Sequence, residues 1–131
     1  AYYTIDVTYP LNIAEAGLDH GAKFYGLVSA HGAKATSLSY YLKMKGTLES
    51  ELKNLKYTHL AFARPSLLKG DREEFRLLET MSESLMNLMP GNYKAIDAKD
   101  VAAALILAAQ KPLSSAAALS SASMQGSANK R

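Results

Sequence analysis

Two short apolar runs, each flanked by segments of helical periodicity, limit the folds open to this chain. The first run covers residues 23–28, between a glycine and a serine, and the second covers residues 57–63 and is closed by Arg64 and Pro65. Both have the length of a buried strand, and Pro65 fits a strand exit because proline lacks the N–H that a sheet ladder needs. Apolar strands that alternate with helices are typical of a parallel sheet with crossover helices. The sequence therefore predicts an α/β fold.

Two helices are predicted around the first apolar run. Thr8 can cap the first helix, which tolerates Pro10 in its first turn because the N–H groups there have no partner within the helix. Its apolar residues recur at helical spacing, and Gly17 or Gly21 marks its end. The second helix covers residues 36–55, with its start at residue 36 or 37. Helix and strand thus alternate over the first half of the chain.

The second half is predicted to be mostly helical. A helical region covers residues 73–89, with a break near Glu79, and Pro90-Gly91 ends it. Residues 92–96 form a short strand or an extended connection. Asp97 is a suitable N-cap for a further helix that ends before Pro112. Residues 112–131 are rich in Ser and Ala, with no bulky periodic face, and are predicted to be a disordered tail outside the domain of residues 1–111.

The predicted sheet is thin for a complete domain. The chain has 131 residues, of which 48% are hydrophobic and 21% are charged, as in one globular domain. Two or three strands leave an open sheet edge and a poorly covered face. We therefore expect the chain to be the latter part of a larger α/β unit. An open edge also favours self-association, so a homo-oligomer is expected if the chain folds alone.

Composition argues against several classes of protein. No apolar run approaches the roughly eighteen residues of a membrane span, and the N-terminus lacks the order of a signal peptide, so we expect a cytosolic protein without a membrane partner. There is no cysteine, and His20, His31 and His59 are isolated, which makes a metal site improbable. The net charge of +3 is spread among acidic residues, which argues against nucleic-acid binding.

The residues that point to chemistry are Tyr41 and Lys45, on the predicted helix after the first strand. Residues at positions i and i+4 share a helix face, so the phenol and the ammonium group can converge. A cation held near a phenol favours the phenolate. Such a pair suits a proton donor and a neighbouring charge that adjusts its pKa. Tyr40 has the wrong spacing to Lys45 for a shared face and is assigned to packing.

Three motifs follow one another in an order that carries a family resemblance. They are Val-Ser-Ala-His-Gly-Ala at 28–33, Tyr-x-x-x-Lys-Gly at 41–46 followed by Glu49, and Arg-Pro-Ser-Leu-Leu-x-Gly-Asp-Arg at 64–72. Together they resemble the atypical short-chain dehydrogenase/reductases. Within that superfamily the chain is most similar to the Tat-interacting-protein group and its bacterial NAD(P)-binding, nucleoside-diphosphate-sugar-epimerase-like relatives. The resemblance covers residues 6–111.

The resemblance implies the C-terminal half of a Rossmann-type domain that binds NAD(P), with NADP favoured. In that family a glycine-rich loop at the first strand-to-helix turn holds the pyrophosphate. The sequence contains no G-x-G-x-x-G, so we expect the dinucleotide-fingerprint half to be missing and cofactor binding to need it. The residue that separates NAD from NADP belongs to that half as well. The implied partners are the dinucleotide and an unidentified small-molecule substrate.

The resemblance also implies roles for individual residues. Tyr41 would be the acid/base in hydride transfer, and Lys45 would tune it and hold the nicotinamide ribose. The backbone around Pro65 and Ser66 would line the nicotinamide pocket. Ser29 is the candidate hydroxyl at the strand end.

Relatives commonly carry two successive hydroxyl residues at this strand end, and the second, which faces the substrate, is Ala30 here. Losing one such hydrogen bond costs on the order of 3 kcal/mol of transition-state stabilisation. Three interpretations stay open: an NAD(P)-dependent oxidoreductase or epimerase-like enzyme, a nucleotide-binding regulatory protein with weak catalysis, and an inactive fragment.

Overall fold

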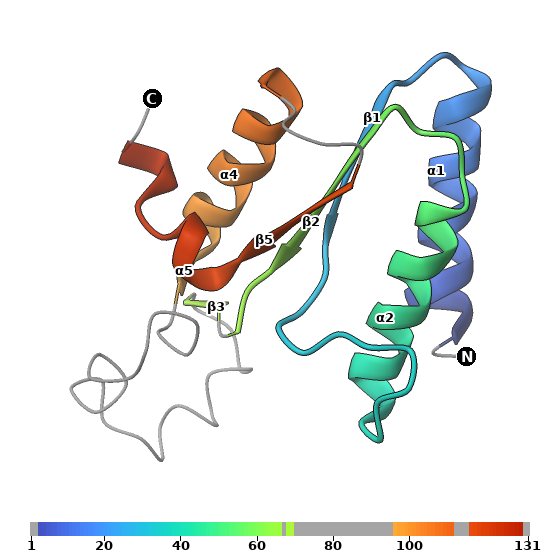
Figure 1. Ribbon diagram of the computed structural model, residues 1–131, viewed down its shortest axis with the longest axis horizontal. Helices are drawn as coiled ribbons and strands as arrows, with labels where there is room; N and C mark the ends of the chain where they lie inside the picture. Colours follow the sequence, from blue (N-terminus) through green and yellow to red (C-terminus); the bar gives the residue numbers. More distant parts are fainter. Residues whose placement is uncertain (1–2, 67, 70–95, 112–115, 130–131) are drawn as a thin grey trace.

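The computed structural model describes residues 3–66, 68–69, 96–111 and 116–129 (Figure 1). In chain order the elements are η1 (Thr4–Thr8), α1 (Tyr9–Asp19), β1 (Phe24–Val28), α2 (Tyr40–Lys53), β2 (His59–Arg64), β3 (Leu68–Lys69), β4 (Ile96–Asp97), α4 (Ala98–Gln110), β5 (Ala116–Ser120), α5 (Ser121–Met124) and η4 (Ser127–Asn129). None of the helices in these ranges has the length and apolar character that a membrane crossing requires.

A three-stranded parallel sheet in the order β1-β2-β5 forms the centre of the fold. Helices α1 and α2 cover one face, and α4 covers the other (Figure 1). Two core clusters match these two layers: one joins Leu48 and Leu52 of α2 to Phe62 of β2, and the other joins Val101 of α4 to Ala63. A short parallel pair, β3 and β4, is separate from the sheet. The α/β prediction is confirmed, and the layers agree with a partial Rossmann-like fold.

The two predicted strands are present, but they differ in burial. β2 has four consecutive buried residues because it lies between two strands and under helices on both faces. β1 lies at the edge of the sheet, and Val28 at its end is 42% exposed. The expectation that both strands are buried is therefore wrong for β1, which lacks a neighbour on one side among the described residues.

The first helix starts earlier than predicted. Thr8 has helical backbone angles, and its side chain makes no capping hydrogen bond. One π-helical turn, η1, precedes it and carries Val7, which is 1% exposed and packs in the core with α2. Burial of Val7 stabilises the extra turn, so Thr8 lies inside a continuous helical segment. Of the two glycines predicted to mark its end, Gly17 lies inside the helix, and Gly21 follows it with a φ of +89°.

The second helix starts later than predicted, at Tyr40. Ser39 is the N-cap, and its hydroxyl accepts a hydrogen bond from the N–H of Leu42 at 3.5 Å. Residues 36–38 belong to the loop before it, because Lys34 donates its N–H to the carbonyl of Leu42 and ties the loop against the helix. Asp97 has the extended backbone of an N-cap for α4, as predicted, although its side chain makes no capping bond.

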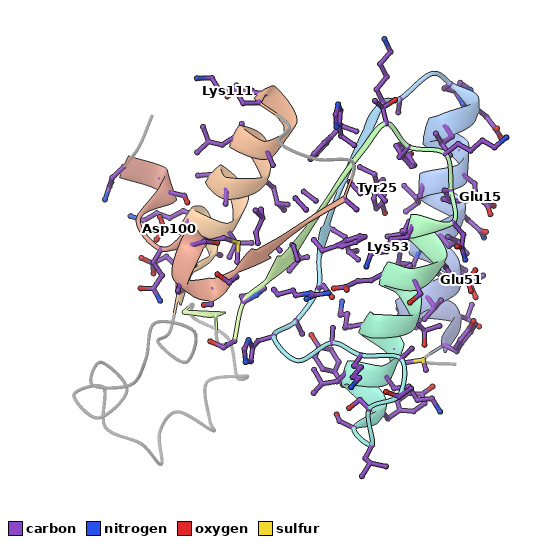
Figure 2. All side chains as sticks on the ribbon, viewed as in Figure 1. Glu15, Tyr25, Glu51, Lys53, Asp100 and Lys111 are labelled. Carbon is purple, nitrogen blue, oxygen red and sulfur yellow. The ribbon has the colours of Figure 1, made fainter. Side chains whose placement is uncertain are left out.

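The C-terminal segment is folded where we expected a disordered tail. β5 pairs in parallel with β2, and Met124 of α5 is buried against α4. The Asp100 carboxylate accepts a hydrogen bond from the N–H of Ala128 at 2.9 Å, close to the start of α4 (Figure 2). This bond lowers the pKa of Asp100 despite the opposing effect of burial. The tail prediction is thus wrong for residues 116–129, because the free edge of β2 supplies hydrogen-bond partners that local composition does not reveal. The domain boundary at residue 112 stays a prediction.

The helical region predicted at 73–89, its break near Glu79 and its end at Pro90-Gly91 lie outside the described residues. The same holds for residues 92–95, while Ile96 is the first residue of β4.

Candidate functional site

The Tyr41 and Lys45 side chains meet beside the carboxyl end of β1. The Lys45 ammonium donates a hydrogen bond to the carbonyl oxygen of Val28, the last residue of β1, at 3.3 Å. The same nitrogen lies 5.7 Å from the centroid of the Tyr41 ring, within the range of a cation–π contact. Helical spacing brings the two side chains together, and the hydrogen bond to Val28 fixes them at the sheet edge where open α/β proteins bind ligands.

Tyr41 lies on the first turn of α2 and is 55% exposed. Among the described residues, the Tyr41 ring is therefore partly open to solvent and can be reached by a ligand. Tyr40, which we assigned to packing, is 54% exposed, so that prediction is wrong. Both tyrosines lie in the first turn of α2, and each is about half exposed.

A serine follows the carboxyl end of each of the three sheet strands. The hydroxyl of each serine is buried and has no hydrogen-bond partner among the described residues. These serines are Ser29 after β1, Ser66 after β2 and Ser121 after β5. A buried polar group without a partner is uncommon and costs free energy. Three such hydroxyls at one sheet edge mark a place where a ligand or water can supply the missing hydrogen bonds. Sequence reasoning missed Ser121 because the surrounding Ser/Ala-rich segment was assigned to the tail.

The loops after β1 and β2 are tied to each other at this edge. The N–H of Ser29 donates to the carbonyl of Ala63 at 2.7 Å, and the N–H of His31 donates to the carbonyl of Pro65 at 3.1 Å. Ser29 and Ala30 are 2% and 7% exposed. The structure thus brings Ser29 and Pro65 close in space, while the Ser29 hydroxyl itself is shielded from solvent.

An ion pair joins α2 to the end of β2. The Arg64 guanidinium donates from Nε to Oε1 of Glu49 at 3.0 Å and from Nη2 to Oε2 at 2.5 Å. Glu49 is 3% exposed, and hydrogen bonding to it raises the pKa of Arg64. Both residues belong to the recognised motifs, but the sequence reading did not pair them. The available signal was an acidic residue on the buried stripe of a helix and an arginine that ends an apolar strand.

Gly46, next to Lys45, lets the loop after β1 lie directly on α2. A Cβ atom at Gly46 would overlap the backbone of Lys34 and Ala35. The loop therefore packs against the helix backbone one residue from the lysine that reaches Val28. Within the described ranges, no group of three or more His, Asp or Glu side chains could hold a metal ion.

No protein-family model matches the chain. Protein FMP52 of Candida albicans is 35% identical over 113 residues, which is 82% of this chain and 49% of that protein. Protein HTATIP2 of Rattus norvegicus is 32% identical over 70% of this chain and 38% of its own length. Protein fmp52-1 of Aspergillus terreus is 42% identical over 59% of this chain and 33% of its own length. The chain therefore spans half or less of the length of these relatives.

These relatives, together with the order of the three motifs and the parallel sheet, define the class of protein. The chain belongs to the atypical short-chain dehydrogenase/reductase superfamily. Within it, the chain is a member of the NAD(P)-binding group that contains HTATIP2 and the FMP52 proteins. The names of the fungal relatives describe them as mitochondrial, and this finding contradicts our expectation of a cytosolic protein.

Proposed function

We propose that this chain supplies the Tyr-x-x-x-Lys half of an NAD(P)-binding, short-chain-dehydrogenase-like site. The observation that carries the proposal is the position of the Lys45 ammonium, 3.3 Å from the Val28 carbonyl and 5.7 Å from the Tyr41 ring. A lysine held by a strand end points its charge at the ligand-binding edge of the sheet. The names of the fungal relatives support a mitochondrial location for the protein.

The residues present suit a nicotinamide dinucleotide. Lys45 keeps two further N–H donors after its bond to Val28, which suits the hydroxyls of a ribose. Pro65 and Ser66 lie at the same edge, and the Ser66 hydroxyl is buried without a hydrogen-bond partner among the described residues. In its reduced form the dinucleotide would supply the hydride, with NADPH preferred to NADH.

Tyr41 would exchange a proton between its hydroxyl oxygen and an oxygen of the substrate. The nearby Lys45 charge favours the phenolate that forms when Tyr41 gives up its proton. General acid–base catalysis of this kind contributes about 10²–10⁴-fold to rate. The half-exposed ring of Tyr41 leaves room for a small-molecule substrate.

The residues that follow β1, Ser29 and Ala30, favour a second function. Ala30 carries no hydroxyl, and Ser29 is 2% exposed, so neither residue offers an accessible donor to a substrate oxygen. A protein with this site can bind the dinucleotide and still reduce substrates slowly. The alternative is therefore a nucleotide-binding regulatory protein, in which cofactor occupancy matters more than turnover.

The two candidate functions are separated by measuring binding and turnover on the same full-length protein. NADPH and NADH binding is followed by nucleotide fluorescence, and hydride transfer is followed with a panel of small carbonyl compounds. The enzyme function predicts turnover that falls about 10²-fold or more in Tyr41→Phe, with binding retained. Binding without turnover supports the regulatory protein. Absence of nucleotide binding by the full-length protein contradicts both.

A further inference from the structure

A pocket lies between the loop after β1, helix α2 and the end of β2. Its volume is about 310 Å³, at the lower end of the range for small-molecule sites. The pocket is lined by Ala33, Lys34, Ala35, Thr36, Gly46, Glu49, Ser50, Lys53 and Arg64. The loop after β1, the face of α2 that turns away from Tyr41, and the end of β2 thus contribute to it. Neither Tyr41 nor Lys45 lines this pocket.

The charges around this pocket are unbalanced. Lys34, Lys53 and Arg64 are cationic, and Glu49 is the one acidic side chain in the lining. Glu49 is already engaged by Arg64 through two hydrogen bonds, so the pair leaves the two lysines without a carboxylate in the pocket wall. The formal charge of the lining is +2, which favours an anionic ligand.

The donors of the pocket are held in place from several elements. Arg64 uses two of its five N–H donors on Glu49, and its side chain is 32% exposed, which leaves donors at the pocket. The Lys53 ammonium lies 5.8 Å from the centroid of the Phe62 ring, which keeps it over the sheet. The hydroxyls of Thr36 and Ser50 add two neutral donors to the lining. A fork of charged and neutral N–H and O–H donors is the arrangement that binds phosphate oxygens.

We infer that this pocket, defined by Lys34, Lys53 and Arg64, binds the phosphate group of a phosphorylated ligand at a site distinct from the Tyr41–Lys45 site. The ligand is a small phosphate ester or diphosphate, because the volume of about 310 Å³ suits a small molecule and the cationic lining suits phosphate oxygens. The same chemistry occurs in a soluble metabolite and in an anionic lipid headgroup.

The inference is tested by calorimetric titration of the full-length protein with inorganic pyrophosphate, in low salt and again in 0.5 M NaCl. The test variant is Lys34→Gln combined with Lys53→Gln, which removes two charges and leaves the Glu49–Arg64 pair intact. The matched control is Lys111→Gln, at the end of α4 on the opposite side of the sheet (Figure 2). Pyrophosphate should bind the wild type and the control equally, and the double variant at least about tenfold more weakly. High salt should weaken binding to the wild type.

A second experiment distinguishes a soluble ligand from a lipid headgroup, and this pocket from the Tyr41–Lys45 site. Vesicles of phosphatidylcholine containing phosphatidic acid replace pyrophosphate in a sedimentation assay. Binding that is weakened in the double variant supports the inference, and the probe that shows it, pyrophosphate or vesicles, identifies the ligand as soluble or lipid. NADPH titration of the same double variant should give the wild-type dissociation constant, while Lys45→Met should lower NADPH affinity and leave pyrophosphate binding unchanged. Failure of NADPH binding alone contradicts the proposed function, not the pocket. The inference is overturned if neither probe binds, or if binding is the same in the double variant.

Discussion

Gly46 of α2 lies against the backbone of Lys34, with no side chain between the helix and the loop. The contact fixes the loop that leaves β1 next to the helix that carries Tyr41 and Lys45. It also forms the wall of the second pocket. One glycine therefore sets the separation of helix and loop at both sites.

Replacing Gly46 by alanine should destabilise the protein. In an exposed helix interior, Gly→Ala stabilises by about 1 kcal/mol through helix propensity. At Gly46 the added Cβ meets the backbone of Lys34 and Ala35, and backbone cannot move aside as a flexible side chain can. We expect a net loss of about 1–3 kcal/mol in the free energy of unfolding, measured by urea denaturation. Ser50→Ala, at an exposed position of α2, is the control and should change stability by less than about 0.5 kcal/mol. A more stable Gly46→Ala protein would show that the close contact is absent.

The Glu49–Arg64 pair should contribute strongly to stability. Glu49→Gln keeps the shape of the side chain but removes the charge that Arg64 binds. Breaking a fully buried ion pair costs about 3–5 kcal/mol, and the exposure of Arg64 to solvent reduces this to about 1–3 kcal/mol. Urea denaturation measures the loss. Glu51→Gln, on the solvent-exposed side of the same helix (Figure 2), is the matched control and should have little effect. Equal losses in the two variants would contradict a structural role for the pair.

Acid should loosen the contact between α4 and η4. The hydrogen bond from Ala128 lowers the pKa of Asp100 in the folded protein below its ordinary value of 3.8. Because folding lowers this pKa, the Asp100 carboxylate stabilises the fold in full at pH values well above its ordinary pKa. This stabilisation is lost as the pH falls from about 3.8 through the lowered pKa. Melting temperature measured between pH 2 and 7 should therefore fall less steeply in acid for Asp100→Asn than for the wild type. Asp19→Asn, at an exposed carboxylate of α1, is the control. Identical acid profiles for the wild type and Asp100→Asn would rule out this contribution.

The predictions that the structure confirms rest on local pattern. Residues 23–28 and 57–63 are short, apolar and closed by turn residues, and these properties alone identify β1 and β2. Tyr41 and Lys45 come together because helical spacing fixes their relative position wherever the helix lies. The parallel arrangement of the strands follows from the helix between them.

The features that sequence reasoning missed depend on contacts between distant segments. Ala116–Ser120 has no alternation of apolar and polar residues, and it forms β5 because β2 offers an unpaired edge. Glu49 and Arg64 are 15 residues apart and meet only when α2 packs on the sheet. Burial of Val7 against α2 extends the first helix beyond Thr8. Local propensity carries no information about such partners.

The central claim is that Lys45 holds a nicotinamide dinucleotide at the carboxyl end of β1, and NADPH affinity of the full-length protein tests it most directly. Lys45→Met keeps the aliphatic stem and removes the charge, while Lys43→Met makes the same change at an exposed position of α2. Loss of a charged hydrogen bond of about 1.5–3 kcal/mol predicts a dissociation constant raised about 10- to 150-fold in Lys45→Met and unchanged in Lys43→Met. NADPH binding of equal strength in the wild type and both variants would contradict the claim.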